Sequence, residues 1–395
     1  MVGIGEDGLD GLSSVQRKLI EGAELLVGGE RHLAMVSDDG RQRLVWPKPL
    51  SDAFPELQKW RGRKVCVLAS GDPMLFGVGV MLSKTFPVEE MTVLPGHSAF
   101  SLAAARLGWG LMDCSLVTLH GRALENLEAH IHPGERLLIL SWDGKTPQKV
   151  AQMLTARGFG ESRMIVLEAM GGPKERRVKA TAEAWPHEPS ADLNSIAVEC
   201  LAGPEAKIFP LAPGLEDAAF KHDGQLTKRE VRAVTLSRLM PGPSQCLWDV
   251  GAGAGSVAIE WMRSAPRTRA YAIEKSAQRC GLIAENAAAL GVPGLNLIEG
   301  SAPDALASLS QPDAIFIGGG LTNENLLGRC WSALPVGGRL VANAVTIEGE
   351  AELKACHDRW GGEMTRLAVS RMEGIGAFRA WRPLMPVTLY AVRKS

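Results

Sequence analysis

Short apolar runs recur along the chain and are separated by segments with helical periodicity. In the second half, the apolar runs are CLWDVG (246–251), RAYAIE (269–274), NLIEG (296–300), PDAIFIG (312–318) and GRLVANAV (338–345). Helical patterns follow from Gly255, over 276–290, from Asn323 and over 350–360. Apolar strands that alternate with helices indicate a parallel sheet covered on both faces. A last run, PVTLYAV (386–392), is typical of a strand that pairs antiparallel at the edge of such a sheet.

The first half alternates in the same way, but glycine or proline follows almost every predicted strand. These strands lie in MVGIG (1–5), LLVG (25–28), KVCVLASGDP (64–73), TVLPGHS (92–98), CSLVTLHGR (114–122), RLLILSWDG (136–144), SRMIVLEAMGG (162–172) and NSIAVECLAG (194–203). Loops at the carboxyl ends of parallel strands are where α/β proteins bind ligands. The glycine-rich loops are therefore candidate ligand loops.

The stretch GPEAKIFPLAPGLED (203–217) separates the two halves. It contains three prolines and two glycines and has no sustained periodicity, which is typical of a linker. A chain of 395 residues also suits two domains better than one. We predict an N-terminal domain over 1–203, a linker over 204–217 and a C-terminal domain over 218–395.

Composition narrows the class of protein. Lys plus Arg (43) nearly balance Asp plus Glu (44), which argues against a surface that binds nucleic acid through bulk charge. The seven cysteines form no CxxC pair, which predicts reduced thiols and no zinc or other metal site. The N-terminus lacks the features of a signal peptide, and no window approaches the roughly 18 apolar residues of a membrane span. We expect a cytoplasmic protein without a membrane segment.

The most specific local pattern is DVGAGAGSVAIEW (249–261), a strand that breaks into alternating glycines and then enters a helix. Gly251, Gly253 and Gly255 allow a tight turn and close approach of a ligand to the positive end of the helix. Glu274 ends the next strand, where a carboxylate suits the hydroxyls of a ribose. An NAD fingerprint would need glycine at Ser256, so the spacing favours S-adenosylmethionine. A bare glycine turn is equally consistent with close packing of a helix on a strand.

The surrounding segments carry a resemblance to a family. In order and spacing, LTKREVRAVTLSRL (226–239), the glycine turn, EGSAPDAL (299–306), IGGG (317–320) and VGGRLVANAV (336–345) resemble the C-terminal half of the precorrin-6Y C5,15-methyltransferases (decarboxylating) of cobalamin biosynthesis. Some tRNA methyltransferases share parts of this pattern. The resemblance implies a Rossmann-like fold and an S-adenosylmethionine site. Its residues would be Thr227, Gly251, Ala252, Gly253, Ala254, Gly255, Glu274, Ser301 and Ala302. Many such enzymes have Asp where this chain has Ser301.

The N-terminal loops carry a second resemblance. GDP and PG are ordinary turn formers when they occur alone. Here VGIG, ASGDP, PGHSA and LHGR follow one another in the order of the tetrapyrrole (corrin and porphyrin) methylases, whose two α/β halves hold the cofactor in a cleft. The resemblance implies cofactor contacts at Gly71, Asp72, Pro73, Met74, Ser98 and Ala99. Many members have GPGD in the first loop, where this chain has Gly5-Glu6-Asp7-Gly8.

Together the resemblances imply a bifunctional, S-adenosylmethionine-dependent C-methyltransferase with two cofactor sites per chain and no metal. Its substrate would be the tetrapyrrole precorrin-6B, methylated at carbon 5 by the N-terminal domain. The C-terminal domain would methylate carbon 15 and remove the ring C acetate carboxyl, giving precorrin-8. We expect a homo-oligomer. Two alternatives stay open: a tRNA methyltransferase, and an enzyme in which one domain is a non-catalytic binding module.

Methyl transfer from a sulfonium needs alignment and desolvation more than an activated side chain, so no catalytic residue is identified. The substrate carries many carboxylates, for which arginine is the expected partner. The candidates are Arg122, after the LHG turn, and Arg371, Arg379 and Arg382 in SRMEGIGAFRAWRP (370–383), a segment that could cover the pocket. For each of them, a solvated surface position is the alternative.

Overall fold

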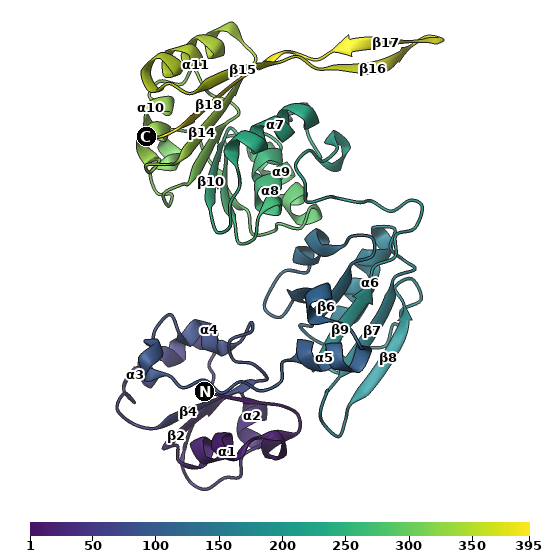
Figure 1. Cartoon of the computed structure of the whole chain (residues 1–395), viewed down its shortest axis with the longest axis vertical. Coiled ribbons are helices and arrows are strands. Elements are labelled where there is room, and N and C mark those ends of the chain that lie inside the picture. Colours follow the sequence, from purple (N-terminus) through teal and green to yellow (C-terminus); the bar gives the residue numbers. More distant parts are fainter. The chain divides into compact units, whose positions relative to one another are not determined.

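The computed structural model describes all of residues 1–395, which separate into two units (Figure 1). One unit comprises Met1–Leu124 and Ile131–Lys207, and the other comprises Glu125–His130 and Ile208–Ser395. Both mix helices and strands, which confirms the predicted α/β class. None of the helices combines the length and apolar character needed to cross a membrane.

The first sheet of the N-terminal unit is parallel, in the order β1-β4-β2-β3. Successive apolar residues of a strand point to opposite faces of this sheet. Leu26 packs in the core on one face, while Leu25 and Val27 pack in the core on the other face. The strands are β1 (Val2–Ile4), β2 (Leu25–Gly28), β3 (Gln42–Val45) and β4 (Val65–Ser70). The helices are α1 (Ser14–Glu21), α2 (Glu30–Ala34), α3 (Phe54–Gln58) and α4 (Val78–Leu82).

The second sheet of this unit is mixed, in the order β5-β6-β9-β7-β8. Only β5 and β6 are parallel, and the other pairs are antiparallel. Its strands are β5 (Ser115–Thr118), β6 (Arg136–Leu140), β7 (Arg163–Glu168), β8 (Arg176–Thr181) and β9 (Asn194–Glu199). The helices are α5 (Ala99–Leu107) and α6 (Thr146–Ala156), and Phe100 of α5 packs on Leu138 of β6.

One predicted strand of the N-terminal unit is wrong. Residues 92–98 form only an isolated bridge between Leu94 and Val2. Pro95 has no N–H to continue a ladder, and the chain turns there into α5. Conversely, β3 and β8 are polar enough that their sequences give no apolar run.

The C-terminal unit contains a seven-stranded sheet in the order β12-β11-β10-β13-β14-β18-β15. Helices α7, α8 and α9 pack on one face against Leu247 and Phe316, whereas α10 and α11 pack on the other against Trp248 and Ile315. The strands are β10 (Cys246–Val250), β11 (Arg269–Glu274), β12 (Asn296–Glu299), β13 (Ala314–Ile317), β14 (Arg339–Ala344), β15 (Glu363–Leu367) and β18 (Val387–Arg393). The helices are α7 (Arg229–Leu239), α8 (Ser256–Ser264), α9 (Ala277–Ala289), α10 (Leu326–Ala333) and α11 (Ile347–Trp360).

The last strand is antiparallel, as predicted, but its edge position is wrong. β18 pairs with β14 on one side and with β15 on the other, so β15 forms the edge. Between them, β16 (Ser370–Ile375) and β17 (Phe378–Pro383) form an antiparallel hairpin. Figure 1 shows this hairpin extending away from the sheet of its own unit.

Candidate functional site

The glycine turn joins β10 to α8 and has the backbone conformation that its sequence predicts. Gly251, Gly253 and Gly255 all have positive φ angles, which disfavour residues with a side chain. A Cβ on Gly251 would also lie 3.0 Å from the Gly319 nitrogen, in the turn after β13. The glycines therefore permit both the turn and its close approach to a neighbouring strand end.

Glu274, at the end of β11, is buried and holds this turn. Its Oε2 accepts a hydrogen bond from the Gly253 N–H at 3.0 Å, and its Oε1 accepts one from the Ser276 N–H at 3.0 Å. Each carboxylate oxygen can accept a second hydrogen bond. The carboxylate thus fixes the turn and keeps acceptor capacity for a ligand hydroxyl.

The other residues predicted to bind the C-terminal cofactor gather around the same turn. A Cβ on Gly253 would lie 3.0 Å from the Gln225 oxygen, which places the chain leading to Thr227 over the turn. The Gly300 N–H donates to the Glu274 carbonyl oxygen at 3.0 Å, so Ser301 and Ala302 follow directly beside it. The site is thus built at the carboxyl ends of β10 to β13.

Asp249 lies one residue before the end of β10 and is completely buried. Its Oδ2 accepts a hydrogen bond from the Ala258 N–H at 3.0 Å, in the first turn of α8, but its Oδ1 has no partner. Burial, reinforced by the charge of Glu274, raises the pKa of Asp249 to about 7. A group that titrates near neutral pH therefore stands beneath the glycine turn.

In the N-terminal unit, three predicted loops meet. The Gly71 N–H donates to the Ile4 oxygen at 3.1 Å, and the Gly96 N–H donates to the Gly71 oxygen at 2.9 Å. A Cβ on Gly3 would lie 1.8 Å from the Gly71 oxygen, so this contact requires glycine. The loop after β4 therefore touches both the end of β1 and the turn that leads into α5.

The predicted N-terminal cofactor residues have defined local roles in these loops. Asp72 Oδ1 accepts a hydrogen bond from the Met74 N–H at 2.8 Å, which closes a tight turn around Pro73. Ser98 caps α5, because its Oγ accepts a hydrogen bond from the Ser101 N–H at 3.0 Å, and Ala99 is the first residue of that helix. The side chain of Met74 is exposed beside them.

Of the four candidate arginines, the structure brings only Arg122 to the predicted loops. Its guanidinium lies 5.9 Å from the ring centroid of Phe76, in the loop that begins at Gly71. Arg371 is bound instead to Asp217 at 3.0 Å and to Glu230 at 2.6 Å.

Arg371 and Arg382 lie on paired positions of the β16–β17 hairpin, and Arg379 lies on β17 of the same hairpin. Arg382 pairs with Glu373 within the hairpin, and Arg379 is exposed there. A role of Arg371, Arg379 and Arg382 in binding substrate carboxylates stays a prediction.

A polar cluster at the carboxyl edge of the first sheet was not predicted. Arg31 and His32 follow β2, Ser70 ends β4 and Glu6 follows β1. The signal that could have found it is the basic pair Arg31-His32, two residues after the glycines at the end of β2 in the sequence VGGERH (27–32).

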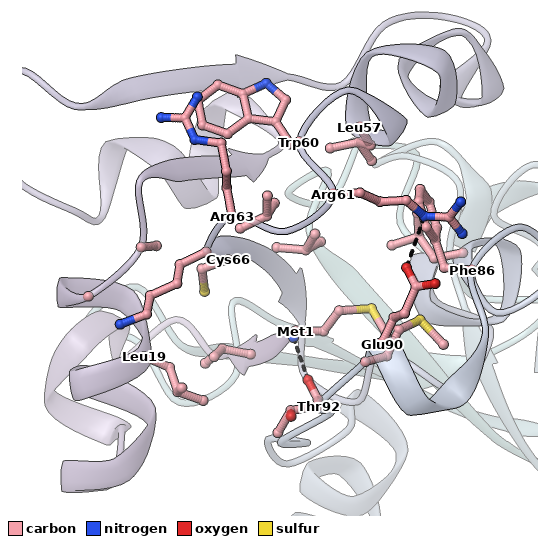
Figure 2. A pocket seen from close by; sticks show the side chains of 18 of the residues that line it. Met1, Leu19, Leu57, Trp60, Arg61, Arg63, Cys66, Phe86, Glu90 and Thr92 are labelled. Carbon is pink, nitrogen blue, oxygen red and sulfur yellow. Dashed lines mark hydrogen bonds and ion pairs between the residues drawn. The ribbon is translucent and has the colours of Figure 1, made fainter.

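A cavity of about 810 Å³ lies at the opposite end of that sheet (Figure 2). Trp60, Phe86 and Leu19 supply apolar walls, and the Arg63 guanidinium stacks 4.0 Å from the Trp60 ring centroid. The amine of Met1 donates to the Thr92 oxygen at 2.6 Å. The cavity lies near the amino ends of the strands, whereas the predicted cofactor residues follow their carboxyl ends. None of the predicted cofactor residues therefore lines this cavity.

Comparison with known proteins places both units in described families. Residues 1–185 match the family described as tetrapyrrole (corrin/porphyrin) methylases, and residues 218–394 match the precorrin methyltransferase domain. A Sinorhizobium protein named precorrin-6Y C(5,15)-methyltransferase [decarboxylating] is 46% identical, over 100% of this chain and 96% of its own length.

Two shorter relatives are each named for a single methylation. A cobalt-precorrin-7 C(5)-methyltransferase of Salmonella typhimurium is 31% identical over 45% of this chain and 87% of its own length. A probable cobalt-precorrin-6B C(15)-methyltransferase (decarboxylating) of Saccharolobus solfataricus is 34% identical over 34% of this chain and 71% of its own length.

Proposed function

The chain belongs to the precorrin-6Y C(5,15)-methyltransferase (decarboxylating) family, and from this premise we propose that it methylates precorrin-6B at carbons 5 and 15 from two separate sites. It is an S-adenosylmethionine-dependent C-methyltransferase of the tetrapyrrole pathway, like the other members of the family. The N-terminal domain (1–203) would methylate carbon 5. The C-terminal domain (218–395) would methylate carbon 15 and release the ring C acetate carboxyl as carbon dioxide, giving precorrin-8.

The C-terminal site fits S-adenosylmethionine, which supplies a methyl group activated on a sulfonium. The observation that carries the proposal is the turn itself, in which glycines with positive φ angles approach the neighbouring strand end and Glu274 retains free acceptor capacity. Gly251 to Gly255 would approach the cofactor with their backbone, and Glu274 would accept hydrogen bonds from ribose hydroxyls. Thr227, Ser301 and Ala302 flank this position.

In the N-terminal site, the three loops that meet at Gly3, Gly71 and Gly96 would hold the second cofactor molecule. Close backbone contact between them leaves few side chains to obstruct a ligand. Asp72 and Pro73 fix the turn that would face it, and Met74 presents an exposed apolar side chain.

Neither site offers an activated nucleophile or a metal cluster, and the proposed chemistry needs none. The attacking group is an electron-rich carbon of the macrocycle, so this chain has to align it with the methyl group and exclude water. In decarboxylation the conjugated imine of the macrocycle can accept the electron pair that the departing carboxylate leaves. The protein's residues would therefore act by aligning the substrate with the cofactor and by excluding water.

The two shorter relatives support the division of labour, because each is named for one of the two methylations and each covers less than half of this chain. The full-length relative, which shares both domains, gives no support to a tRNA methyltransferase.

We also propose that the chain forms homo-oligomers through the β16–β17 hairpin. Two-stranded hairpins are marginally stable alone in water. This hairpin exposes Ile375, Phe378 and Trp381, the last two at 81% and 72%. Exposed large apolar side chains on a projecting element are typical of a protein interface. Because we expect a homo-oligomer, we propose that a second copy of the chain binds this hairpin.

The direct test of the activity is incubation of the purified protein with precorrin-6B and S-adenosylmethionine, followed by mass spectrometry of the product. We expect a product that has gained two methyl groups and lost one carboxyl. A product with one methyl group, or with both methyls and the carboxyl retained, would contradict the proposal.

A further inference from the structure

The unpredicted cluster at the carboxyl edge of the first sheet is centred on the guanidinium of Arg31. Its Nη2 lies 2.7 Å from His32 Nε2 and 2.9 Å from Ser70 Oγ, and its Nη1 donates to the Glu6 carboxylate. Residues at the ends of three neighbouring strands thus form hydrogen bonds with one arginine. No hydrogen bond of the chain uses its Nε, and the side chain is 38% exposed.

His32 acts in this cluster as a neutral hydrogen-bond acceptor. Arginine can only donate, so Nε2 of His32 accepts and the ring proton resides on Nδ1. Burial, reinforced by the charge of Arg31, lowers the pKa of His32 to about 4, which keeps the ring neutral at physiological pH. His32 is a buried residue and its Nδ1 has no partner, so the contacts with Arg31 and Ser70 hold the imidazole in place.

The cluster lies where a ligand of the N-terminal site would be. Ser70 directly precedes Gly71 and Asp72 in the loop proposed to hold the cofactor. Glu6 lies against the turn after β7 in the second sheet, since a Cβ on Gly172 would come within 2.7 Å of the Glu6 Cβ. Arg31 therefore stands between the two sheets of this unit, where Glu6 is its only carboxylate partner.

We propose that Arg31 binds a ligand carboxylate in the N-terminal site, and that His32 is a positioning residue that orients its guanidinium. This inference rests on the proposed function and names a binding residue for it. The Nε–H, which has no partner within the chain, and the Nη1 hydrogen that Glu6 leaves free can each donate a charge-assisted hydrogen bond to a carboxylate oxygen. Both the tetrapyrrole and the amino-acid end of S-adenosylmethionine carry a carboxylate group.

The test uses the full chain with Arg31→Met, and Arg63→Met as the matched control. Arg63 also pairs with one glutamate, Glu24, but at the opposite end of the same sheet. A charge-assisted hydrogen bond to a carboxylate is worth about tenfold to a hundredfold in affinity. We expect Arg31→Met to raise either the KM for precorrin-6B in carbon 5 methylation or the Kd for S-adenosylmethionine by that factor. Methylation at carbon 15 and the kinetics of Arg63→Met should be unchanged.

The two arms of the experiment identify the source of the carboxylate. Calorimetric titration with S-adenosylmethionine alone reports the cofactor, and the KM at saturating cofactor reports the substrate. If both values for Arg31→Met stay within twofold of the wild type, the proposal is overturned. Failure of the wild type to methylate precorrin-6B would contradict the proposed function instead, and the cofactor titration would still test Arg31.

His32 is tested by a pair of variants that separates positioning from mere packing. In His32→Gln, the side-chain oxygen can replace Nε2 as the acceptor for Arg31, whereas His32→Leu fills similar space without an acceptor. We expect the glutamine variant to keep affinity within about threefold of wild type and the leucine variant to lose about tenfold, with kcat for carbon 5 changed less than KM. Equal effects of the two substitutions would contradict the positioning role.

Discussion

At the scale of single residues, the backbone roles were predictable and the buried polar partners were not. Gly251, Gly253 and Gly255 adopt the positive φ angles that the alternating glycines imply, and Glu274 lies beside them. The sequence could not reveal that Arg371 would be bound by Asp217 and Glu230, since ion pairing depends on which distant segments meet. The cluster of Arg31 with His32 was missed for the same reason.

Asp249 gives a prediction at this scale. Because its pKa is raised to about 7 from 3.8, the folded protein holds a proton there that the unfolded chain releases. The free energy of unfolding should therefore fall between about pH 4 and pH 7, by at most about 1.4 kcal/mol per pH unit from this group. Asp249→Asn removes this contribution, so the variant should gain stability relative to wild type when the pH rises from 5 to 8.

Urea unfolding of both proteins at the two pH values measures this difference. Asp313→Asn is the control, because Asp313 also accepts a backbone N–H, from Cys246, but at the other end of the same sheet. Parallel pH dependences for wild type and Asp249→Asn would show that the carboxyl does not titrate in this range.

At the scale of elements, strands with mostly apolar sequence were predicted well. β10, β11, β13 and β14 all lie within the predicted runs, because strands covered on both faces of a sheet consist mainly of apolar residues. β3, β8 and the β16–β17 hairpin were missed because they are exposed and need little apolar surface. The mixed order of the second sheet depends on which strands pair, and apolar content alone does not specify pairing.

The segment before α7 is fastened to the C-terminal unit by a buried ion pair. Arg232 of α7 donates to Glu260 of α8 at 2.6 Å, and both are almost fully buried. Glu260 also accepts from the N–H groups of Gly214 and Leu215, at 2.6 and 3.0 Å, although these residues lie in the predicted linker. Arg232 further donates to the Thr227 oxygen at 2.5 Å, so the pair holds a residue of the proposed cofactor site.

Arg232→Met should therefore destabilise the C-terminal unit by about 3–5 kcal/mol, because it leaves Glu260 charged and unpaired in the interior. Arg238→Met, on the same helix, removes an exposed pair with Glu363 and should cost at most about 1 kcal/mol. Chemical denaturation compares the two variants. Similar losses of stability in both variants would mean that the charge of Glu260 is stabilised by groups other than Arg232.

Substitutions in the β16–β17 hairpin test the proposed homo-oligomer. Replacing Phe378 and Trp381 by serine removes the largest exposed apolar side chains of the hairpin and should lower the molar mass measured by light scattering. Met112→Ser, at a residue that is 97% exposed in the N-terminal unit, should leave the mass unchanged. An unaltered mass in the double variant, with the wild type oligomeric, would place the interface elsewhere.

At the scale of the whole molecule, the late position of the glycine turn was the informative feature, because an additional domain has to precede it. The family matches over 1–185 and 218–394 agree with two methyltransferase domains in one chain. The sequence could not show how the substrate is held, since that depends on side chains from separate strand ends. Arg31, proposed above to bind a ligand carboxylate, and its partners His32 and Ser70 come from two separate strand ends of the first sheet.

The proposal of two cofactor sites predicts a binding stoichiometry. Calorimetry with S-adenosylmethionine should give two molecules per full-length chain, and Gly253→Arg should leave one. Arginine at this position would have to adopt a φ of +60°, with its Cβ 3.0 Å from the Gln225 oxygen. A single site in the wild type would favour the alternative that one domain is a binding module without catalytic function.

The most direct test of two separate methylating sites is mass spectrometry of the products that two full-length variants form from precorrin-6B. Asp72→Ala should yield a product that lacks only the carbon 5 methyl and has still lost its carboxyl. Gly253→Arg should lack the carbon 15 methyl and retain the carboxyl. Loss of both methyl groups in either variant would contradict the assignment of one methylation to each domain.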